Sequence, residues 1–444
     1  MGNRGGIYPK NGEGEVRKMY LFFIRHFNDI DHFTPIVWKM HKDNHPVAVY
    51  CINPKYDIQN DYRLRFLREE GIKVDFIYND FAERLGPLHR LVRFLFLSTF
   101  AIERKLDSNG QSQFSSLLGS FGRVAGKIGS RFYRLAKRKY YDTNWGHDLL
   151  QKSEAKALCF DWIRPHRYVV DVLLKAANDI SIPTLSLPHG VFLYTNDSVR
   201  IAPRGEMWFE KYHRYDYVIV QNKLFKEIIS QDGINGDKIH VLGSARYCSE
   251  WIEQNKKIIP RKMDLKSNNT EKLKIVLMTT RPQYRINVER MVKTFDILSH
   301  FSEVETVIKP HTRSGDEAKM YENIPLSNVS DLSSVELCEW ADVVLVIASS
   351  ILIEPLLQNK PVLYLKYLHE NTTEYEEFGA CWTIHDDTEL QDALMSLRDG
   401  KRDVPYSDQN VQRWLAEIIY GGRSERDVLQ DYEDFIVTCA AKKN

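Results

Sequence analysis

The sequence lacks the features of an exported or membrane-spanning chain. Its six cysteines are scattered, with no two close together, so it contains neither a disulfide framework nor a zinc-finger spacing. Residues 1–18 are polar and Gly-rich without the apolar core of a signal peptide, and no stretch approaches the roughly 18 uninterrupted apolar residues of a membrane span. We therefore expect a cytoplasmic protein that is neither secreted nor membrane-spanning.

Two common nucleotide-binding motifs and any excess of charge are also missing. The turn after the first apolar run reads Arg25-His26-Phe27-Asn28 rather than Gly-x-Gly-x-x-Gly, which argues against NAD and FAD, and no Walker A loop is present, which argues against a P-loop NTPase. Lys and Arg total 61 and Asp and Glu total 60, so the formal net charge of +1 excludes a generally polycationic nucleic-acid binder. We expect no cofactor and no nucleic-acid partner.

What the sequence contains is an alternation of short apolar runs with longer amphipathic segments, the pattern of βαβ units around a parallel sheet. The 444 residues are enough for two or three packed cores. The expected strands are 19–25, 46–52, 72–78, 157–161, 183–187, 217–221 and 238–242 in a first series, and 271–280, 304–309, 342–348, 361–365 and 381–384 in a second. The predicted fold class is α/β, with two doubly wound Rossmann-like domains.

The two series divide the chain into an N-terminal domain, 19–253, and a C-terminal domain, 271–405. The polar stretch 254–269 is the expected linker. Residues 406–444 are expected to be helical and to pack back on the N-terminal domain. Within that domain, 81–150 has no strand signal and carries twelve Lys and Arg against five Asp and Glu, a local charge of about +7. Interleaved aromatic residues favour basic helices lying on the anionic inner face of a membrane, although a solvated helical face has the same composition.

Polar residues follow several strands of the first series, where ligands of doubly wound sheets collect. Asp161 ends an apolar run and can act as nucleophile, general base or helix N-cap. His189, in a Pro-His-Gly turn, can move a proton, hold a phosphate or simply lie in a surface turn. Asn28, Asp29 and Asp31 follow the first strand. Asp29 and Asp31 form an Asp-x-Asp, but we expect these residues to line the cleft or cap a helix rather than hold a metal.

Several strands of the second series are followed by cationic or hydroxyl side chains. Lys309 and His311 follow one strand and Arg281 follows another, where they can face a phosphate in the crevice between the domains. Ser349 and Ser350 then open a helix, and a helix N-terminus favours anions. Glu354 can accept hydrogen bonds from ribose hydroxyls, although a plain Ser cap with an acid in the first turn gives the same pattern.

Together, the His189-Gly190 turn, the cationic strand end at Lys309 and the Ser-Ser-x-x-x-Glu beginning at Ser349 resemble GT-B glycosyltransferases that use cytidine-nucleotide donors in bacterial surface-polymer assembly. The resemblance spans roughly residues 19–400 and includes two branches, the CDP-glycerol glycerophosphotransferases and the β-Kdo transferases of capsule and O-antigen synthesis. The chain departs from the former where Ile347 and Ala348 replace an acid and a Tyr, and from sialyltransferase-like families where Pro310-His311 replaces His-Pro.

The resemblance implies a metal-independent GT-B enzyme whose second domain binds a CMP- or CDP-activated donor and whose first domain binds an oligosaccharide or lipid-linked acceptor. It makes Lys309, His311, Ser349 and Ser350 phosphate ligands. Glu354 becomes a ribose contact, and Asp161 and His189 the catalytic candidates. The leading hypothesis is transfer of a sugar, with Kdo as the first choice, from a CMP donor. The alternatives are phosphoglycerol transfer, a nonhydrolysing UDP-sugar epimerase and a non-catalytic membrane adaptor.

Overall fold

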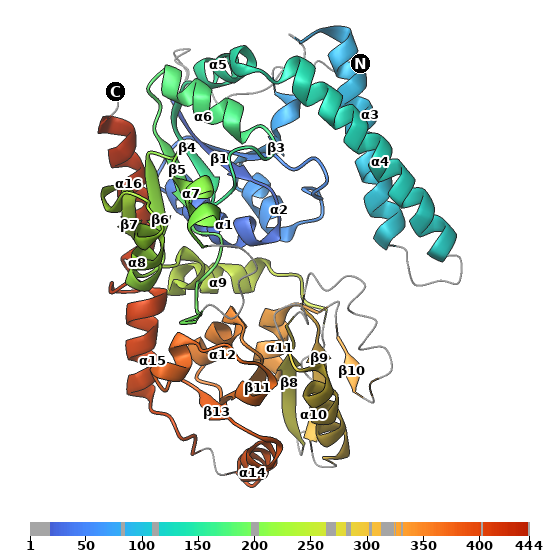
Figure 1. The fold of residues 1–444 in the computed structure, drawn as a ribbon, viewed down its shortest axis with the longest axis vertical. Helices are drawn as coiled ribbons and strands as arrows, with labels where there is room; N and C mark the ends of the chain where they lie inside the picture. The colour runs from blue at the N-terminus through green and yellow to red at the C-terminus, as the bar shows by residue number, and fades with distance from the viewer. Residues whose placement is uncertain are drawn as a thin grey trace. The chain divides into compact units, whose positions relative to one another are not determined.

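The structure is a computed structural model that describes residues 18–80, 85–108, 115–196, 204–262, 272–280, 286–301, 304–311, 324, 326–329, 332–400 and 403–442. These residues form two compact units. Unit 1 consists of Met1–Gly190, Arg204–Gln254 and Ser424–Asn444, and unit 2 consists of Val191–Pro203 and Asn255–Arg423. Each unit is therefore built from separate stretches of the chain, and each is drawn in Figure 1.

Unit 1 is built on a seven-stranded parallel sheet with the strand order β3-β2-β1-β4-β5-β6-β7. The strands are β1 Met19–Ile24, β2 Val47–Cys51, β3 Lys73–Phe76, β4 Ala155–Asp161, β5 Thr184–Leu187, β6 Tyr217–Val220 and β7 Ile239–Val241. Every residue of β1 is buried, because helices cover both faces of a parallel sheet. The order reverses direction between β1 and β4, which places the carboxyl ends of β1, β4 and β5 side by side.

Besides the two long helices described below, unit 1 contains α1 Phe27–Lys42, α2 Tyr62–Glu69, α5 Thr143–Lys152, α6 Val170–Asp179, α7 Arg204–Tyr212, α8 Lys223–Gln231, α9 Ser249–Ile258 and α16 Val428–Lys442. Helix α9 begins in this unit and extends into the stretch expected to be a linker. The last helix, α16, packs against α1 and β4.

Unit 2 is built on a six-stranded parallel sheet with the order β10-β9-β8-β11-β12-β13. Its strands are β8 Leu273–Met278, β9 Val304–Lys309, β10 Ser327–Asn328, β11 Val343–Val346, β12 Val362–Leu365 and β13 Trp382–Ile384, and its helices are α10 Val288–His300, α11 Ser334–Trp340, α12 Ile353–Leu357, α13 Glu374–Glu377, α14 Asp387–Arg398 and α15 Asp408–Trp414. The predicted α/β fold class, with two doubly wound Rossmann-like domains, is confirmed.

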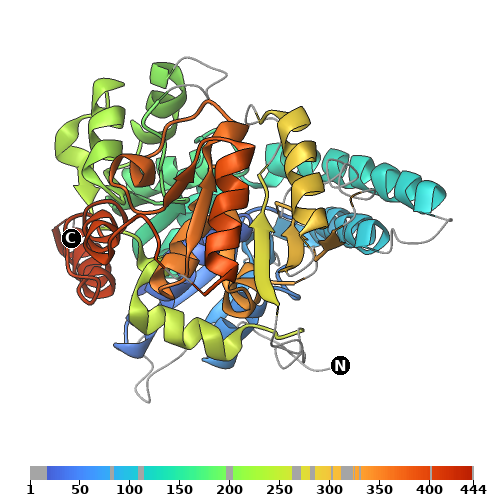
Figure 2. The ribbon, with the colours of Figure 1, turned by 90° about the horizontal axis from the view of Figure 1, so that it is seen from below.

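The basic segment of unit 1 forms two long helices, α3 Gly86–Ser108 and α4 Ser115–Tyr140, which lie side by side in Figures 1 and 2. Glycines allow this close approach, because a Cβ at Gly129 would lie 2.4 Å from Thr99 Oγ1. At the base of this hairpin, the hydroxyl oxygens of Tyr78 and Tyr133 are 2.9 Å apart. Among the described residues, no helix is both long enough and apolar enough to cross a bilayer.

Candidate functional site

The carboxyl ends of β1, β4 and β5 bring together a buried cluster of charged side chains in unit 1. Arg25 follows β1, Asp161 is the last residue of β4, and His189 lies in the turn after β5. Because these three strands are neighbours in the sheet, residues that are far apart in the sequence meet at one edge. The sequence-predicted pair of Asp161 and His189 is therefore a pair in space.

Asp161 is the centre of this cluster. One of its carboxylate oxygens is 3.0 Å from His189 Nδ1, and the other accepts from Arg25 Nε at 2.9 Å. A second guanidinium nitrogen of Arg25 contacts the same oxygen. Both oxygens are thus engaged by neighbouring side chains, and the carboxylate is almost completely buried, so it is not exposed to a reactant.

Asp29 and Asn28, both predicted to line the cleft, also contact the imidazole of His189. Asp29 Oδ1 is 3.2 Å from His189 Nδ1, and Asp29 Oδ2 accepts from the backbone N–H of Arg25 at 2.8 Å. The amide nitrogen of Asn28 is 3.3 Å from His189 Nε2. The first turn of α1 therefore contacts both nitrogens of the imidazole, with the Asp29 carboxylate at Nδ1, where Asp161 of β4 also lies, and the Asn28 amide at Nε2.

Charge pairing shifts the protonation of this cluster. Burial alone would lower the pKa of His189, but the charge and hydrogen bond of Asp161, together with Asp29, raise it above 6.5. Burial opposes ionisation of Asp29, yet Arg25 and the hydrogen bonds from His189 and His26 keep its pKa well below the usual range. The low pKa of Asp29 keeps its carboxylate ionised, and the raised pKa of His189 means that it keeps its proton to a higher pH than a free histidine.

An aromatic ring and a lysine, neither of them selected in the sequence analysis, also lie at this cluster. The ring of Trp162 stacks on that of His189, with centroids 5.2 Å apart. Lys211, on α7, places its ammonium 4.3 Å from the centroid of the Trp162 ring, and burial lowers its pKa to about 8. No sequence pattern marks Lys211, because its neighbour Trp162 is distant in the chain; Arg25 was detectable as the first cation after β1.

Asp31 lies apart from this cluster. Its carboxylate contacts the buried guanidinium of Arg63, and Arg246 Nη1 is 2.9 Å from its other oxygen. The two acids of the Asp-x-Asp therefore face different partners, because successive residues of a helix point in different directions. This separation does not suit one cation held by both carboxylates.

Another set of groups has the chemistry of metal ligands. One ligand atom each of His26, Asp29 and His189 lies within 4.8 Å of the others. Two imidazoles and a carboxylate suit zinc or a similar ion. Arg25, however, contacts Asp29 directly at 3.3 Å, so its positive charge would oppose a divalent cation at this position.

The candidate donor residues occupy the carboxyl edge of the sheet in unit 2, except Arg281, which lies outside the described residues. Lys309 ends β9 and is buried, and its ammonium donates to the backbone carbonyl of Leu332 at 2.5 Å. His311 is partly exposed just beyond it. The lysine therefore holds a neighbouring loop within this unit.

The turn after β11 has a strained backbone. Ala348 adopts a φ of +40°, and its carbonyl accepts from the hydroxyl of Tyr194 at 2.9 Å. Ser349 follows and caps the next turn by accepting from the N–H of Ile351, and Ser350 begins a 3₁₀ turn that leads into α12 and the buried Glu354. Strain of this kind in a non-glycine residue is concentrated at functional sites.

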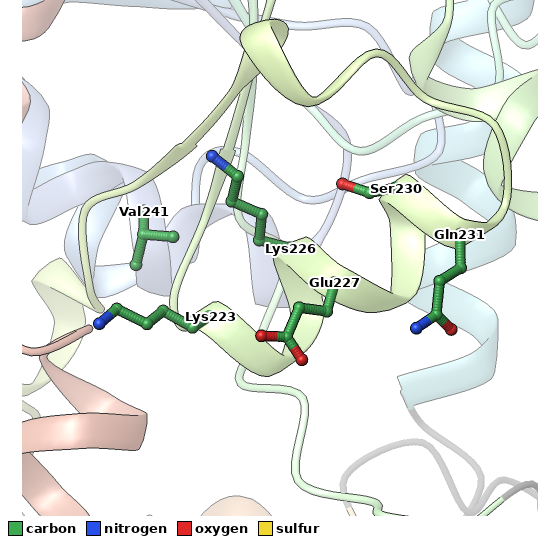
Figure 3. Close-up of a pocket in the computed structure, with 6 residues that line it drawn as sticks. All are labelled: Lys223, Lys226, Glu227, Ser230, Gln231 and Val241. Carbon is green, nitrogen blue, oxygen red and sulfur yellow. The ribbon is translucent and has the colours of Figure 1, made fainter.

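A separate hollow of about 510 Å³ lies in unit 1, along α8 and beside β7. Figure 3 shows the side chains that line it. Its described lining residues are Lys223, Lys226, Glu227, Ser230, Gln231 and Val241. The ammonium of Lys226 donates to the backbone carbonyl of Ile239, at 3.0 Å. These residues are distinct from the candidate site residues.

No protein-family model and no curated protein matches the sequence. Solved structures match its fold over most of the chain. A putative UDP-N-acetylglucosamine 2-epimerase from Listeria monocytogenes matches with a TM-score of 0.53 at 13% identity, over 93% of this chain and 94% of that one. A UDP-GlcNAc 2-epimerase from Methanocaldococcus jannaschii matches with a TM-score of 0.53 at 13% identity, over 93% of this chain and 99% of that one. A variant of the wall teichoic acid polymerase TagF, with one histidine replaced, matches with a TM-score of 0.50 at 12% identity, over 96% of this chain and 89% of that one.

These structural neighbours are enzymes, and they establish that the chain has the GT-B fold that the resemblance implied. At such low identity the likeness concerns the fold, so the reaction has to be argued from the residues of this chain.

Proposed function

We propose that this protein is a GT-B transferase that passes a group from a cytidine-nucleotide donor to a hydroxyl of an oligosaccharide or lipid-linked acceptor. The observation that carries the proposal is the buried cluster in which Asp161 and Asp29 hold His189 at the edge of the first sheet. A histidine oriented by a carboxylate is a general arrangement for moving a proton to or from a reacting hydroxyl.

In this proposal the neutral form of His189 is the base. The acceptor oxygen attacks the donor, its proton passes to Nε2, and the bond from the transferred group to the nucleotide phosphate breaks so that CMP leaves. Nδ1 is held by the carboxylates, at 3.0 Å from Asp161 and 3.2 Å from Asp29. Nε2, which the amide nitrogen of Asn28 approaches to 3.3 Å, is then the nitrogen that would accept the proton, with the acceptor hydroxyl taking the place of that amide.

The surroundings of Asp161 argue against its alternative role as a nucleophile. Both of its oxygens are engaged by His189 and Arg25, and the carboxylate is buried. Double displacement would have to break these contacts before attack on an anomeric carbon. Transfer of Kdo from CMP-Kdo would therefore proceed with inversion, with His189 as base and Asp161 as its positioning residue.

Phosphoglycerol transfer is the second candidate, and the positive charge around His189 favours it. Arg25 lies against the cluster, and Lys211 stands over Trp162. In this reaction the acceptor oxygen attacks the outer phosphorus of CDP-glycerol, the P–O–P bond breaks and CMP again leaves. Cations at the reacting phosphate stabilise the charge that develops there.

The donor would be bound by residues of unit 2. Lys309, His311 and Arg281 would bind its phosphate together with Ser349 and Ser350, and Glu354 would bind its ribose. The strained turn at Ala348 supports this location. The reaction is proposed to need no metal, so it should continue at an unchanged rate in excess EDTA; a loss restored by Zn²⁺ would instead assign His26, Asp29 and His189 as ligands.

The decisive experiment incubates the full-length protein with CMP-Kdo, CMP-sialic acid, CDP-glycerol and UDP-GlcNAc in turn, with and without acceptor, and measures released nucleotide. Acceptor-dependent CMP release that is lost in His189→Asn supports the proposal, and the donor that yields it separates the two candidates. Conversion of UDP-GlcNAc to its 2-epimer without acceptor would replace the proposal with an epimerase. Calorimetry with the productive donor then tests unit 2, because Lys309→Ala and His311→Ala should each weaken binding by about 1.5–3 kcal/mol.

A further inference from the structure

Helix α4 combines a strong positive charge with exposed apolar side chains. It carries seven cations and no acid, namely Arg123, Lys127, Arg131, Arg134, Lys137, Arg138 and Lys139. Four large apolar side chains of the same helix are exposed to 66%, 53%, 41% and 48%, respectively Phe121, Val124, Ile128 and Leu135. A helix that is merely solvated has no need of four such side chains in water.

The apolar side chains form a stripe. Their spacings of three, four and seven residues place them within about 60° of one another around the helix axis. The four cations Arg123, Lys127, Arg131 and Arg134 follow one another at spacings of four, four and three residues, so they form a second stripe next to the first. We call these eight residues the α4 face.

The α4 face is not the surface that joins α4 to α3. That contact is made by the opposite side of the helix, where a Cβ at Gly126 would lie 2.1 Å from Glu103 and one at Gly129 would lie 2.4 Å from Thr99. The partner helix adds exposed apolar side chains of its own, at Leu88, Leu91, Phe94 and Ile102. The hairpin has thus formed its internal contact and still presents apolar surface.

A hollow beside the cationic stripe adds to this picture. It has a volume of about 490 Å³, and its described lining residues are Lys55, Glu103, Arg123, Gly126, Lys127, Ser130, Arg131 and Arg134. Its acid, Glu103, is already paired with Lys55, at 3.1 Å. The net positive charge of the lining suits the phosphate of an anionic group.

We propose that the α4 face lies on an anionic lipid bilayer, with the apolar stripe in the boundary between headgroups and acyl chains and the cationic stripe against lipid phosphates. Charge complementarity indicates the partner, because each cation of a helix with seven cations and no acid is attracted to an anionic surface close to it. The exposed apolar stripe then supplies the insertion that a purely electrostatic contact lacks. This proposal stands independently of the reaction proposed above.

The test is co-sedimentation of the full-length protein with vesicles of phosphatidylcholine alone or mixed with phosphatidylglycerol, at low and high salt. We expect binding to the mixed vesicles, weakening with salt, and little binding to the neutral ones. The triple variant Arg123→Glu, Lys127→Glu, Arg134→Glu should lower the partition coefficient by on the order of 100-fold at low salt. A matched triple reversal of exposed cations elsewhere in unit 1, Arg65→Glu, Lys175→Glu and Lys223→Glu, should leave binding near that of the wild type.

A second set of variants separates a bilayer from a soluble phosphate ligand. The triple variant Phe121→Ser, Val124→Ser, Ile128→Ser keeps every cation and should also lose vesicle binding. In a separate variant, Phe121→Trp, the fluorescence of the new side chain should shift to the blue on mixed vesicles. If the serine variant bound as well as the wild type, the face would be an anion site without insertion, and the proposal would fail. Equal binding to neutral and anionic vesicles would overturn it as well. Circular dichroism checks that each variant is folded.

Discussion

His189 lies between the carboxylates of Asp161 and Asp29, which raise its pKa above 6.5 although burial opposes this. The neutral imidazole that can accept a proton therefore becomes abundant at a higher pH than in a free histidine. We predict that kcat/KM for CMP release rises with pH, with a midpoint above 6.5, in a profile measured from about pH 5 to pH 9. A profile that falls through the same range would assign His189 as an acid instead.

Replacement of one carboxylate tests the cause of this shift. Asp161→Asn removes the charge that contributes most to raising the pKa of His189, so the midpoint should move down towards 6.5 and kcat should fall on the order of 100-fold or more. Asp31→Asn is the matched control, because this buried acid pairs with Arg63 and Arg246 instead. It should destabilise the fold without moving the midpoint. The same midpoint in both variants would remove Asp161 from its positioning role.

The free energy of unfolding should also depend on pH, through a buried carboxyl group of unit 2. Glu374 is buried, neither carboxylate oxygen has a hydrogen-bond partner among the described residues, and burial raises its pKa from 4.5 to about 9. A group whose pKa is raised in the folded state adds stability below its unfolded pKa and loses it as pH rises through the folded one. We predict that the free energy of unfolding falls between about pH 5 and pH 9, and that Glu374→Gln makes this fall shallower in urea titrations.

The candidate site shows how far residues can be placed from a sequence. Asp161, His189, Asn28 and Asp29 could be predicted as one group because each follows an apolar run, and carboxyl ends of parallel strands share an edge. The order of the strands in the sheet, which decides which strand ends are neighbours, cannot be read from local sequence periodicity. Lys211 comes from a helix far along the chain, so its approach to Trp162 leaves no local pattern to detect.

At the scale of elements, buried strands were the most predictable feature. Each expected strand overlaps an observed one, and only β4 extends beyond the expected range, by two residues at its start, since buried strands need continuous apolar runs. The strand that was missed, β10 Ser327–Asn328, has two exposed polar residues and thus no such run. The stretch 254–269 was expected to be a linker from its polarity, but residues up to Ile258 belong to α9, where the buried Trp251 anchors the helix.

The contact between α3 and α4 gives a prediction of its own. An alanine at Gly129 would place its Cβ 2.4 Å from Thr99 Oγ1 and 2.9 Å from the ring of Phe100, and Thr99 is held by a hydrogen bond to the carbonyl of Leu95. Overpacking costs about 1–3 kcal/mol, whereas the better helix propensity of alanine returns about 1 kcal/mol. We predict a net destabilisation of the hairpin by Gly129→Ala, measured as faster amide exchange in α3 and α4.

The matched variant for this prediction is Gly126→Ala. Its Cβ would meet the carboxylate end of Glu103, a flexible side chain whose partner Lys55 is largely exposed, so Glu103 can move aside at little cost. We expect amide exchange like that of the wild type or slower. Equal destabilisation by both variants would show that helix packing at Gly129 is not the cause.

At the scale of the whole molecule, the two units are interleaved in the sequence. Residues 191–203 belong to unit 2 although they lie inside the first strand series, and Tyr194 pairs there with Thr373. Residues 424–444 belong to unit 1 although they follow the entire second series. A cut of the chain at a single point between the two sheets therefore does not separate complete folding units.

The last prediction concerns α16, which contributes to unit 1 from the far end of the chain. It buries Ile436 among other apolar residues, and Glu433 lies 2.9 Å from both Lys39 and His45. We expect Ile436→Ala to lower the free energy of unfolding by about 2–5 kcal/mol, a large part of the 5–15 kcal/mol typical of a domain. Thr438→Ala, at an exposed position of the same helix, should change it by about 0.5 kcal/mol or less. Urea titration followed by peptide-resolved hydrogen exchange measures the effect in each unit, and the loss should be confined to peptides of unit 1. A loss of similar size in both variants, or one seen equally in unit 2, would contradict the placement of α16 in the core of the first unit.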